Sequence, residues 1–154
     1  MSEVFTKTVY VGWGDLDSNA HMKNTAYLDK AVDVRMMYFQ EQGFSVREFE
    51  RLRLGPVVMR DEVEYYRELR LLEQVQITLK LAGMSENATR FRMQNEFFRE
   101  DGQMAARVTS TGGWLDLSSR KLVVPPAPLV AAMNNLAHSA DYELLPSSLK
   151  GEKS

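Results

Sequence analysis

The chain has 154 residues, a formal net charge of -2 and a pI near 5.7. This length favours a single domain, residues 1–154, which can bury about two-thirds of its unfolded surface. A slightly acidic chain is not expected to bind nucleic acid, because neutralising phosphates requires a basic surface. The chain contains no cysteine, which excludes disulfides, zinc–thiolate sites and a cysteine nucleophile.

Membrane and metal partners are also not expected. The N-terminus has no apolar segment of signal-peptide length, and no run approaches the roughly 18 apolar residues that span a bilayer. The two histidines, His21 and His138, lie in distant segments and give too few metal ligands without thiols. We therefore expect a cytoplasmic protein with no metal and no cofactor.

The first part of the chain changes from a strand pattern to a helix pattern. Residues 5–13 alternate between polar and apolar side chains, which predicts a strand. Residues 24–42 predict a long helix, with Asn24 as a plausible N-cap and Gly43 as its C-terminal stop. Only a narrow side of this helix is polar, so we expect a sheet to enclose it.

One charged side chain interrupts the apolar surface of the predicted helix. Arg35 falls in the middle of that surface, and a buried guanidinium must be paired. Glu62 or Glu64, from the next predicted strand, is the expected partner. A structural ion pair is favoured over a catalytic role for Arg35.

The second part of the chain predicts an antiparallel sheet. After a short helix or covering loop in residues 44–56, the apolar period changes to two. The expected strands are residues 57–69, 74–82, 88–99 and 104–117, followed by a strand end at 122–124, a helix at 128–137 and a polar tail from 147. Strand, long helix and four strands predict an α+β fold, an antiparallel sheet curled around the helix.

Five of the ten residues from 15 to 24 carry a carboxylate, a carboxamide or an imidazole: Asp15, Asp17, Asn19, His21 and Asn24. They lie between the first strand and the helix, where folds commonly place reactive groups. The helix start near Asn24 brings unpaired N–H groups and the positive end of the helix dipole to this loop. Turn and capping chemistry is the alternative explanation, and we assign Asp15 to it.

The loop and the predicted layout together resemble the hotdog-fold thioesterases, in which a sheet wraps a central helix. The similarity to acyl-carrier-protein thioesterases and acyl-CoA thioester hydrolases of the 4-hydroxybenzoyl-CoA thioesterase superfamily is gapless over Asp17-x-Asn19-x-His21-x-x-Asn24-x-x-Tyr27-Leu28. Residues 62–69 look like the second strand of the family, and 114–117 with 124–126 look like its last. The resemblance covers roughly residues 5–128.

The resemblance implies an acyl-CoA thioester hydrolase that releases a carboxylic acid and free coenzyme A. It implies that Asp17, Asn19 and His21 are catalytic, with Asp17 as general base or nucleophile, and that Asn24, Thr25 and Tyr27 bind substrate. The backbone near Asn24 is the expected oxyanion site. Active sites in this family lie between subunits, which implies a homodimer or homotetramer.

The 4-hydroxybenzoyl-CoA branch carries a turn similar to Gly14-Asp15-Leu16-Asp17, but its loop is longer and has no counterpart of His21. This difference counts against an aromatic acyl substrate. Lys80, Arg90 and Arg92 are candidates for binding the phosphates of coenzyme A or the acidic surface of a carrier protein. A solvated strand face is the alternative, and Glu96 on the same stretch favours it slightly.

Two other functions remain open on the same fold. One is a hydratase or dehydratase, which resembles this loop but usually carries Asp-x-Asn-Pro-x-His; here the spacing is one residue shorter and the proline is missing. The other is a non-catalytic acyl-binding module. The sequence does not determine the acyl length, the choice between coenzyme A and a carrier protein, or the pathway.

Overall fold

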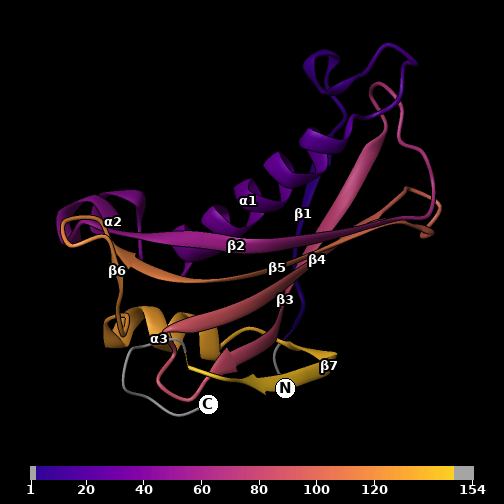
Figure 1. The fold of residues 1–154 in the computed structure, drawn as a ribbon. Helices are drawn as coiled ribbons and strands as arrows, with labels where there is room; N and C mark the ends of the chain where they lie inside the picture. The colour runs from indigo at the N-terminus through magenta and orange to yellow at the C-terminus, as the bar shows by residue number, and fades with distance from the viewer. Residues whose placement is uncertain (1–2, 148–154) are drawn as a thin grey trace.

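One long helix and a curved sheet make up the structure, a computed structural model that describes residues 3–147 (Figure 1). In chain order its elements are β1 (Phe5–Tyr10), η1 (Trp13–Asp15), α1 (Asn24–Glu41), α2 (Val46–Leu52), β2 (Leu54–Tyr65), β3 (Gln74–Ser85), β4 (Arg90–Phe98), β5 (Met104–Asp116), β6 (Lys121–Leu122), α3 (Ala127–Asn134) and β7 (His138–Leu145). No helix among the described residues is long and apolar enough to cross a membrane.

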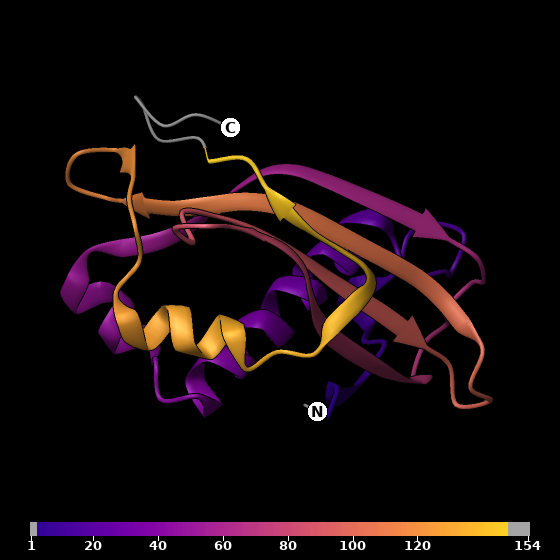
Figure 2. The same ribbon diagram turned by 90° about the horizontal axis from the view of Figure 1, so that it is seen from below.

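The main strands pair in the order β1-β3-β4-β5-β2, and every pair on this path is antiparallel. β2 does not lie beside β3, the next strand in the chain. It pairs with β5 at the far edge, because β1 and β4 already occupy both sides of β3. The sheet curls around α1, as the view from below shows (Figure 2). The predicted α+β hotdog fold is therefore confirmed.

The core lies between α1 and the concave face of the sheet. Side chains of the strands alternate between this face and the outer face; Ile77, Phe97 and Val108 are fully buried on the inner one. The buried side chains of α1 are Ala26, Tyr27, Ala31, Val34, Arg35, Tyr38 and Phe39. The sheet covers one side of this helix, and apolar Val32 and Met37 on the other side are exposed.

Two predicted boundaries near the N-terminus were wrong by a few residues. β1 ends at Tyr10, and Trp13 belongs to the 3₁₀ turn η1 with 81% of its side chain exposed. Asn24 is the first residue of α1, and the N-cap is Lys23. Gly43 follows the helix at a φ of 87°, which glycine adopts without strain, so the predicted stop is confirmed.

The sequence missed β7. The helix expected at residues 128–137 is the shorter α3, and His138 lies in a strand, exposed and stacked on Tyr142 with 3.9 Å between ring centroids. β7 pairs in parallel with β3, which lies more than fifty residues earlier in the chain. A parallel pair is not joined by a tight turn, so no local turn pattern predicts this strand. The predicted polar tail lies, beyond residue 147, outside the described residues.

Arg35 is buried as predicted, with 6% of its surface exposed, but its partners are different. Its Nε donates to Asn95 Oδ1 at 3.1 Å and its Nη2 donates to Ser110 Oγ at 2.6 Å. The Ser110 hydroxyl in turn donates to Asp61. Burial lowers the pKa of Arg35 to about 10 while Asp61 opposes this shift, so the guanidinium stays charged at neutral pH.

The expectation of Glu62 or Glu64 as the partner was wrong because of a β-bulge. The register of β2 against β5 shifts between Val58 and Arg60. A bulge inserts one extra residue and reverses the alternation of side chains after it. Asp61, opposite Ser110, therefore faces the helix, and the two glutamates face outward.

Candidate functional site

The predicted reactive loop is a compact turn closed by backbone hydrogen bonds. The Asp17 N–H donates to the His21 carbonyl oxygen at 2.9 Å, and the Ala20 N–H donates to the Asp17 carbonyl oxygen at 3.1 Å. Leu16 and Met22 form an isolated antiparallel bridge at its base. Ala20 has a φ of 63°, a left-handed conformation that allows the tight reversal.

Two contacts anchor this loop to the rest of the fold. The Met22 N–H donates to the Leu69 carbonyl oxygen at 2.8 Å, from the connection between β2 and β3. The Asp15 carboxylate accepts from the Gly12 N–H at 2.7 Å and pairs with Lys30 Nζ at 2.9 Å. Burial alone raises the pKa of Asp15, but hydrogen bonds from Lys30 and Gly12 outweigh it and hold the pKa below its usual value. The structural role assigned to Asp15 is confirmed.

Asp17 presents its carboxylate at the surface of the chain with one oxygen occupied. Its Oδ1 accepts from the N–H groups of Asn19, at 2.9 Å, and of His21, at 3.2 Å. Its Oδ2 makes no hydrogen bond with any described residue. The turn thus fixes the direction of the carboxylate and leaves one oxygen able to bind a water or attack a carbonyl.

His21 pairs with a carboxylate that the sequence did not single out. Its Nε2 lies 3.1 Å from Glu68 Oε2, and Glu68 also lies 3.7 Å from Arg70 Nη2. Glu68 was expected inside a strand, but it follows β2 in the connection to β3. No local pattern could indicate this pair, because it depends on where that connection meets the loop. Asn19 is exposed, and only its backbone contacts Asp17.

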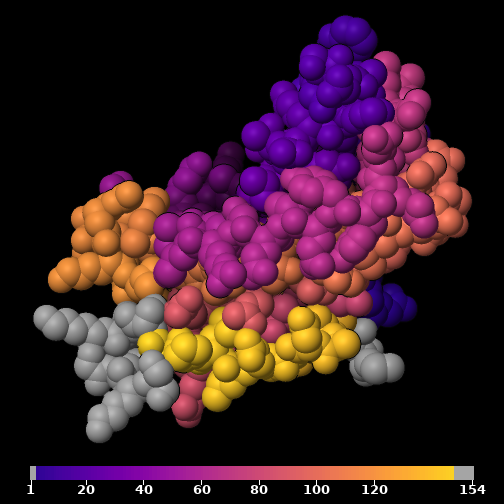
Figure 3. Space-filling model, turned by 45° about the vertical axis from the view of Figure 1, so that its right-hand side comes forward, coloured from indigo at the N-terminus to yellow at the C-terminus, as the bar shows by residue number. Residues whose placement is uncertain are grey.

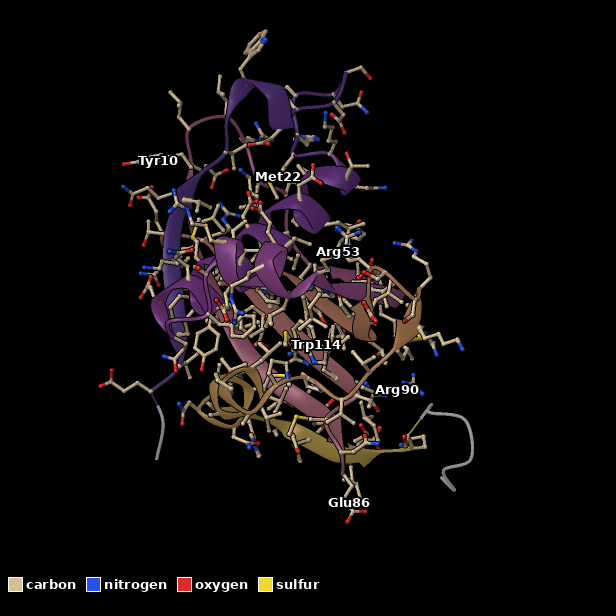
Figure 4. All side chains as sticks on the ribbon, turned by 90° about the vertical axis from the view of Figure 1, so that its left-hand side faces the viewer. Tyr10, Met22, Arg53, Glu86, Arg90 and Trp114 are labelled. Carbon is tan, nitrogen blue, oxygen red and sulfur yellow. The ribbon has the colours of Figure 1, made fainter. Side chains whose placement is uncertain are left out.

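The start of α1 carries no side-chain cap. Lys23, at the N-cap, has no side-chain oxygen to accept from the first N–H groups of the helix. Asn24 and Thr25, the first two helical residues, are exposed. Their backbone N–H groups, together with the positive end of the helix dipole, form a ready site for a developing negative charge. Figure 4 shows Met22 beside this end of α1, well separated from Trp114.

Tyr27, a predicted substrate-binding residue, is buried, with 2% of its surface exposed. Its ring centroid lies 5.2 Å from that of Tyr65 and 5.4 Å from that of Phe97. Burial raises the pKa of Tyr27 to about 12. The ring of Tyr27 therefore packs against residues of β2 and β4.

The three basic candidates for phosphate binding lie on strands of the sheet, away from the loop. Lys80 Nζ lies 3.4 Å from Glu96, and Arg92 pairs with Glu143 of β7. Arg92 and Arg90 alternate along β4 with buried residues of the inner face, so they belong to its outer face. The Nε of Arg90 is buried with no hydrogen-bond partner among the described residues. The structure does not bring these cations to Asp17.

No group of three or more histidine, aspartate or glutamate side chains within residues 3–147 is arranged to hold a metal ion. The antiparallel sheet curled around one long helix is the hotdog fold. Residues 11–133 match the thioesterase-like superfamily, and the chain belongs to this family. No curated protein matches the chain by sequence.

Solved structures show the same fold. The hypothetical protein SAV2348 from Staphylococcus aureus, in complex with CoA, is similar with a TM-score of 0.78 and 20% identity, over 100% of this chain and 96% of that one. A 1,4-dihydroxy-2-naphthoyl-CoA thioesterase from Synechocystis has a TM-score of 0.76 and 16% identity, over 86% and 96%. A DHNA-CoA thioesterase from Staphylococcus aureus has a TM-score of 0.73 and 17% identity, over 79% and 80%.

Proposed function

We propose that this protein hydrolyses acyl-CoA thioesters, with Asp17 as the reacting carboxylate and the start of α1 as the oxyanion site. The observation that carries the proposal is the position of Asp17, with a free Oδ2, in the turn that leads directly into an uncapped helix. Membership of the thioesterase-like superfamily and the CoA complex of a similar structure support a CoA thioester as substrate. A cytoplasmic location is part of the same proposal.

The proposed reaction can follow either of two routes. As a general base, Asp17 takes a proton from water, whose hydroxide attacks the thioester carbonyl. As a nucleophile, its Oδ2 attacks instead and forms an anhydride that water then hydrolyses. In both routes the N–H groups of Asn24 and Thr25 stabilise the oxyanion, and the CoA thiolate leaves and takes up a proton.

A second copy of the chain is part of this proposal. In one chain the Asp17 carboxylate is exposed, and a charged group is a weak catalyst while bulk water screens it. The loop protrudes at one corner of the molecule, as the indigo segment in Figure 3 shows. We propose that another subunit covers this corner and encloses the thioester.

Replacing Asp17 with asparagine tests the proposal. The amide oxygen of Asp17→Asn can still accept from Asn19 and His21, so the turn should persist while the negative charge is lost. We expect kcat for thiol release from acyl-CoA to fall by about 10²- to 10⁴-fold, with unchanged thermal unfolding. Asp33→Asn, an exposed carboxylate two turns along α1, is the matched control. Wild-type turnover by Asp17→Asn would exclude this role.

The alternatives give different results in the same assays. Short, medium, long and aromatic acyl-CoAs should all be assayed for thiol release, and crotonyl-CoA also for hydration. Hydration of crotonyl-CoA without thiol release favours the hydratase. Tight binding of acyl-CoA without any turnover favours the non-catalytic module. Thiol release abolished by Asp17→Asn supports the thioesterase.

A further inference from the structure

An apolar cavity of about 170 Å³ lies between α1 and the strands β2, β4 and β5, far from the loop. Its walls include Val32, Arg35 and Met36 of α1, Pro56 and Val58 of β2, and Trp114 of β5. An apolar cavity of about 150 Å³ is large enough to take up benzene. Val32 and Val58 are partly exposed, so the cavity is accessible from the side where α1 faces β2.

Two hydrogen-bond donors without a partner among the described residues belong to side chains in the wall of this distal cavity, and the donor of Trp114 is buried. Trp114 is fully buried, and its indole Nε1 has no acceptor among the described residues. Arg35 uses Nε and Nη2 for Asn95 and Ser110, while its Nη1 makes no hydrogen bond with the described part of the chain. An unpaired buried donor costs about 1–3 kcal/mol. A purely apolar ligand would leave both donors unsatisfied.

The charge of Arg35 is already balanced. Arg35 donates to the Ser110 hydroxyl, and that hydroxyl donates to Asp61. One hydroxyl thus links the guanidinium to a carboxylate. A ligand carboxylate in this cavity would add an uncompensated negative charge, and burying such a charge is costly. An uncharged oxygen, in a hydroxyl or a keto group, gives the donors an acceptor without that cost.

The position of the cavity relative to the loop suggests which part of a substrate enters it. Arg35 lies eleven residues after Asn24, which is about 16 Å along the helix axis. A saturated acyl chain of about dodecanoyl length spans a comparable distance. The length of a medium-length chain therefore matches the separation between a thioester at the loop and the cavity wall at Arg35.

We infer that the distal cavity binds the far end of an acyl chain and selects chains with a hydroxyl or keto oxygen at or near that end. This inference rests on the proposed thioesterase function and adds a substrate class to it. Trp114 and Arg35 are the residues that recognise the oxygen. The remaining wall supplies apolar contact for the methylene groups before it.

Three substrates of matched length test the inference: dodecanoyl-CoA, its ω-hydroxy analogue and its ω-carboxy analogue. We expect wild-type kcat/KM to be about tenfold higher for the ω-hydroxy substrate than for dodecanoyl-CoA, because one hydrogen bond to an otherwise unpaired donor is gained. The ω-carboxy substrate should be the poorest. A preference for dodecanoyl-CoA or for the ω-carboxy analogue would overturn the inference.

Trp114→Phe removes the indole N–H and keeps an aromatic ring in the wall. In this variant the ratio of kcat/KM for ω-hydroxydodecanoyl-CoA to that for dodecanoyl-CoA should fall about tenfold. Met93→Leu alters the same wall without removing a donor and should keep the wild-type ratio. An unchanged ratio in Trp114→Phe contradicts the assigned role.

A binding measurement separates this inference from the proposed function. Trp13→Phe leaves Trp114 as the single tryptophan, whose fluorescence reports what enters the cavity. Titration with ω-hydroxydodecanoic acid should change the emission at lower concentration than dodecanoic acid does. If no acyl-CoA is hydrolysed, the proposed function fails and this titration still decides the inference. Hydrolysis of dodecanoyl-CoA without any hydroxyl preference leaves the function and overturns the inference.

Discussion

Two buried tyrosines of α1 make the stability of the fold sensitive to alkaline pH. Burial raises the pKa of both Tyr27 and Tyr38 to about 12, above the usual value of 10. The Tyr38 hydroxyl also donates to the Ala132 carbonyl oxygen at 2.6 Å and so connects α1 to α3. These hydroxyls therefore keep their protons in the folded chain at a pH where the unfolded chain has lost them.

We expect the free energy of unfolding to decrease as pH rises from about 10 to about 12, because the unfolded state then binds fewer protons than the folded state. Urea unfolding across this range measures the slope. The double variant Tyr27→Phe with Tyr38→Phe should have a smaller slope. Tyr10→Phe, at an exposed position, should keep the wild-type slope. An equal slope in the double variant would contradict this assignment.

At the scale of single residues, the sequence predicted what chemistry the loop contains but not which residues it contacts. Asp17, Asn19 and His21 stand out because their side chains are reactive and closely spaced. Glu68, which pairs with His21, is one of many exposed acids in the sequence. Its role depends on a connection that reaches the loop only in the folded chain, so no local pattern reveals it.

At the scale of elements, the bulge in β2 determines which side chains reach Arg35. The bulge lies opposite Gly112, where an added Cβ would come within 2.1 Å of the Val57 carbonyl oxygen. No side chain fits between the two strands there. The bulge therefore requires a glycine at position 112. Asp61, in turn, faces inward because of the bulge.

Gly112→Ala should therefore destabilise the protein by about 1–3 kcal/mol or more, the usual cost of overpacking. The midpoint of urea unfolding measures this change. Gly55→Ala lies on the same pair of strands, where the new Cβ meets only the Leu117 side chain at 3.7 Å, and should have little effect. Equal midpoints for the two variants would show that β2 can move away without cost.

The elements themselves were largely predictable, because each depends on local periodicity. α1 and the long strands β3, β4 and β5 were predicted to within a few residues at most of their ends. The bulge was not predicted, because one extra residue in β2 does not change the local composition recognisably. β7 was missed for a related reason: its eight residues pair with β3 across a long sequence separation, and the sequence around His138 continues an apparently helical segment.

At the scale of the whole molecule, β2 lies at one free edge of the sheet. It pairs with β5 on one side, and no other described strand pairs with it. Val58, Met59 and Tyr65 are partly exposed along it, and the strand crosses the front surface in Figure 3. A long, open and partly apolar edge favours pairing with another strand. This edge supports the proposed homo-oligomer.

Light scattering coupled to size-exclusion chromatography measures the oligomeric state. We expect the mass of at least two chains for the wild type and of one chain for Met59→Lys, which places a charge on this edge outside the wall of the distal cavity. Thiol release should decrease together with the loss of the dimer, since an exposed Asp17 is a weak catalyst. Glu86→Lys, at the exposed turn after β3, is the control and should stay oligomeric. A monomeric wild type with full activity would exclude a second subunit from the site.

The length of α1 limits how such an enzyme could change the length of its substrate. Met22, two residues before α1, donates its N–H to Leu69 in the β2–β3 connection, and after the other end of the helix the Phe44 N–H donates to the Phe39 carbonyl oxygen. In the proposed enzyme, the length of the helix therefore sets the distance between the reacting end and the distal cavity. Point substitutions in the cavity wall alter the width and polarity that a ligand meets. Only insertions or deletions of helical turns alter its reach.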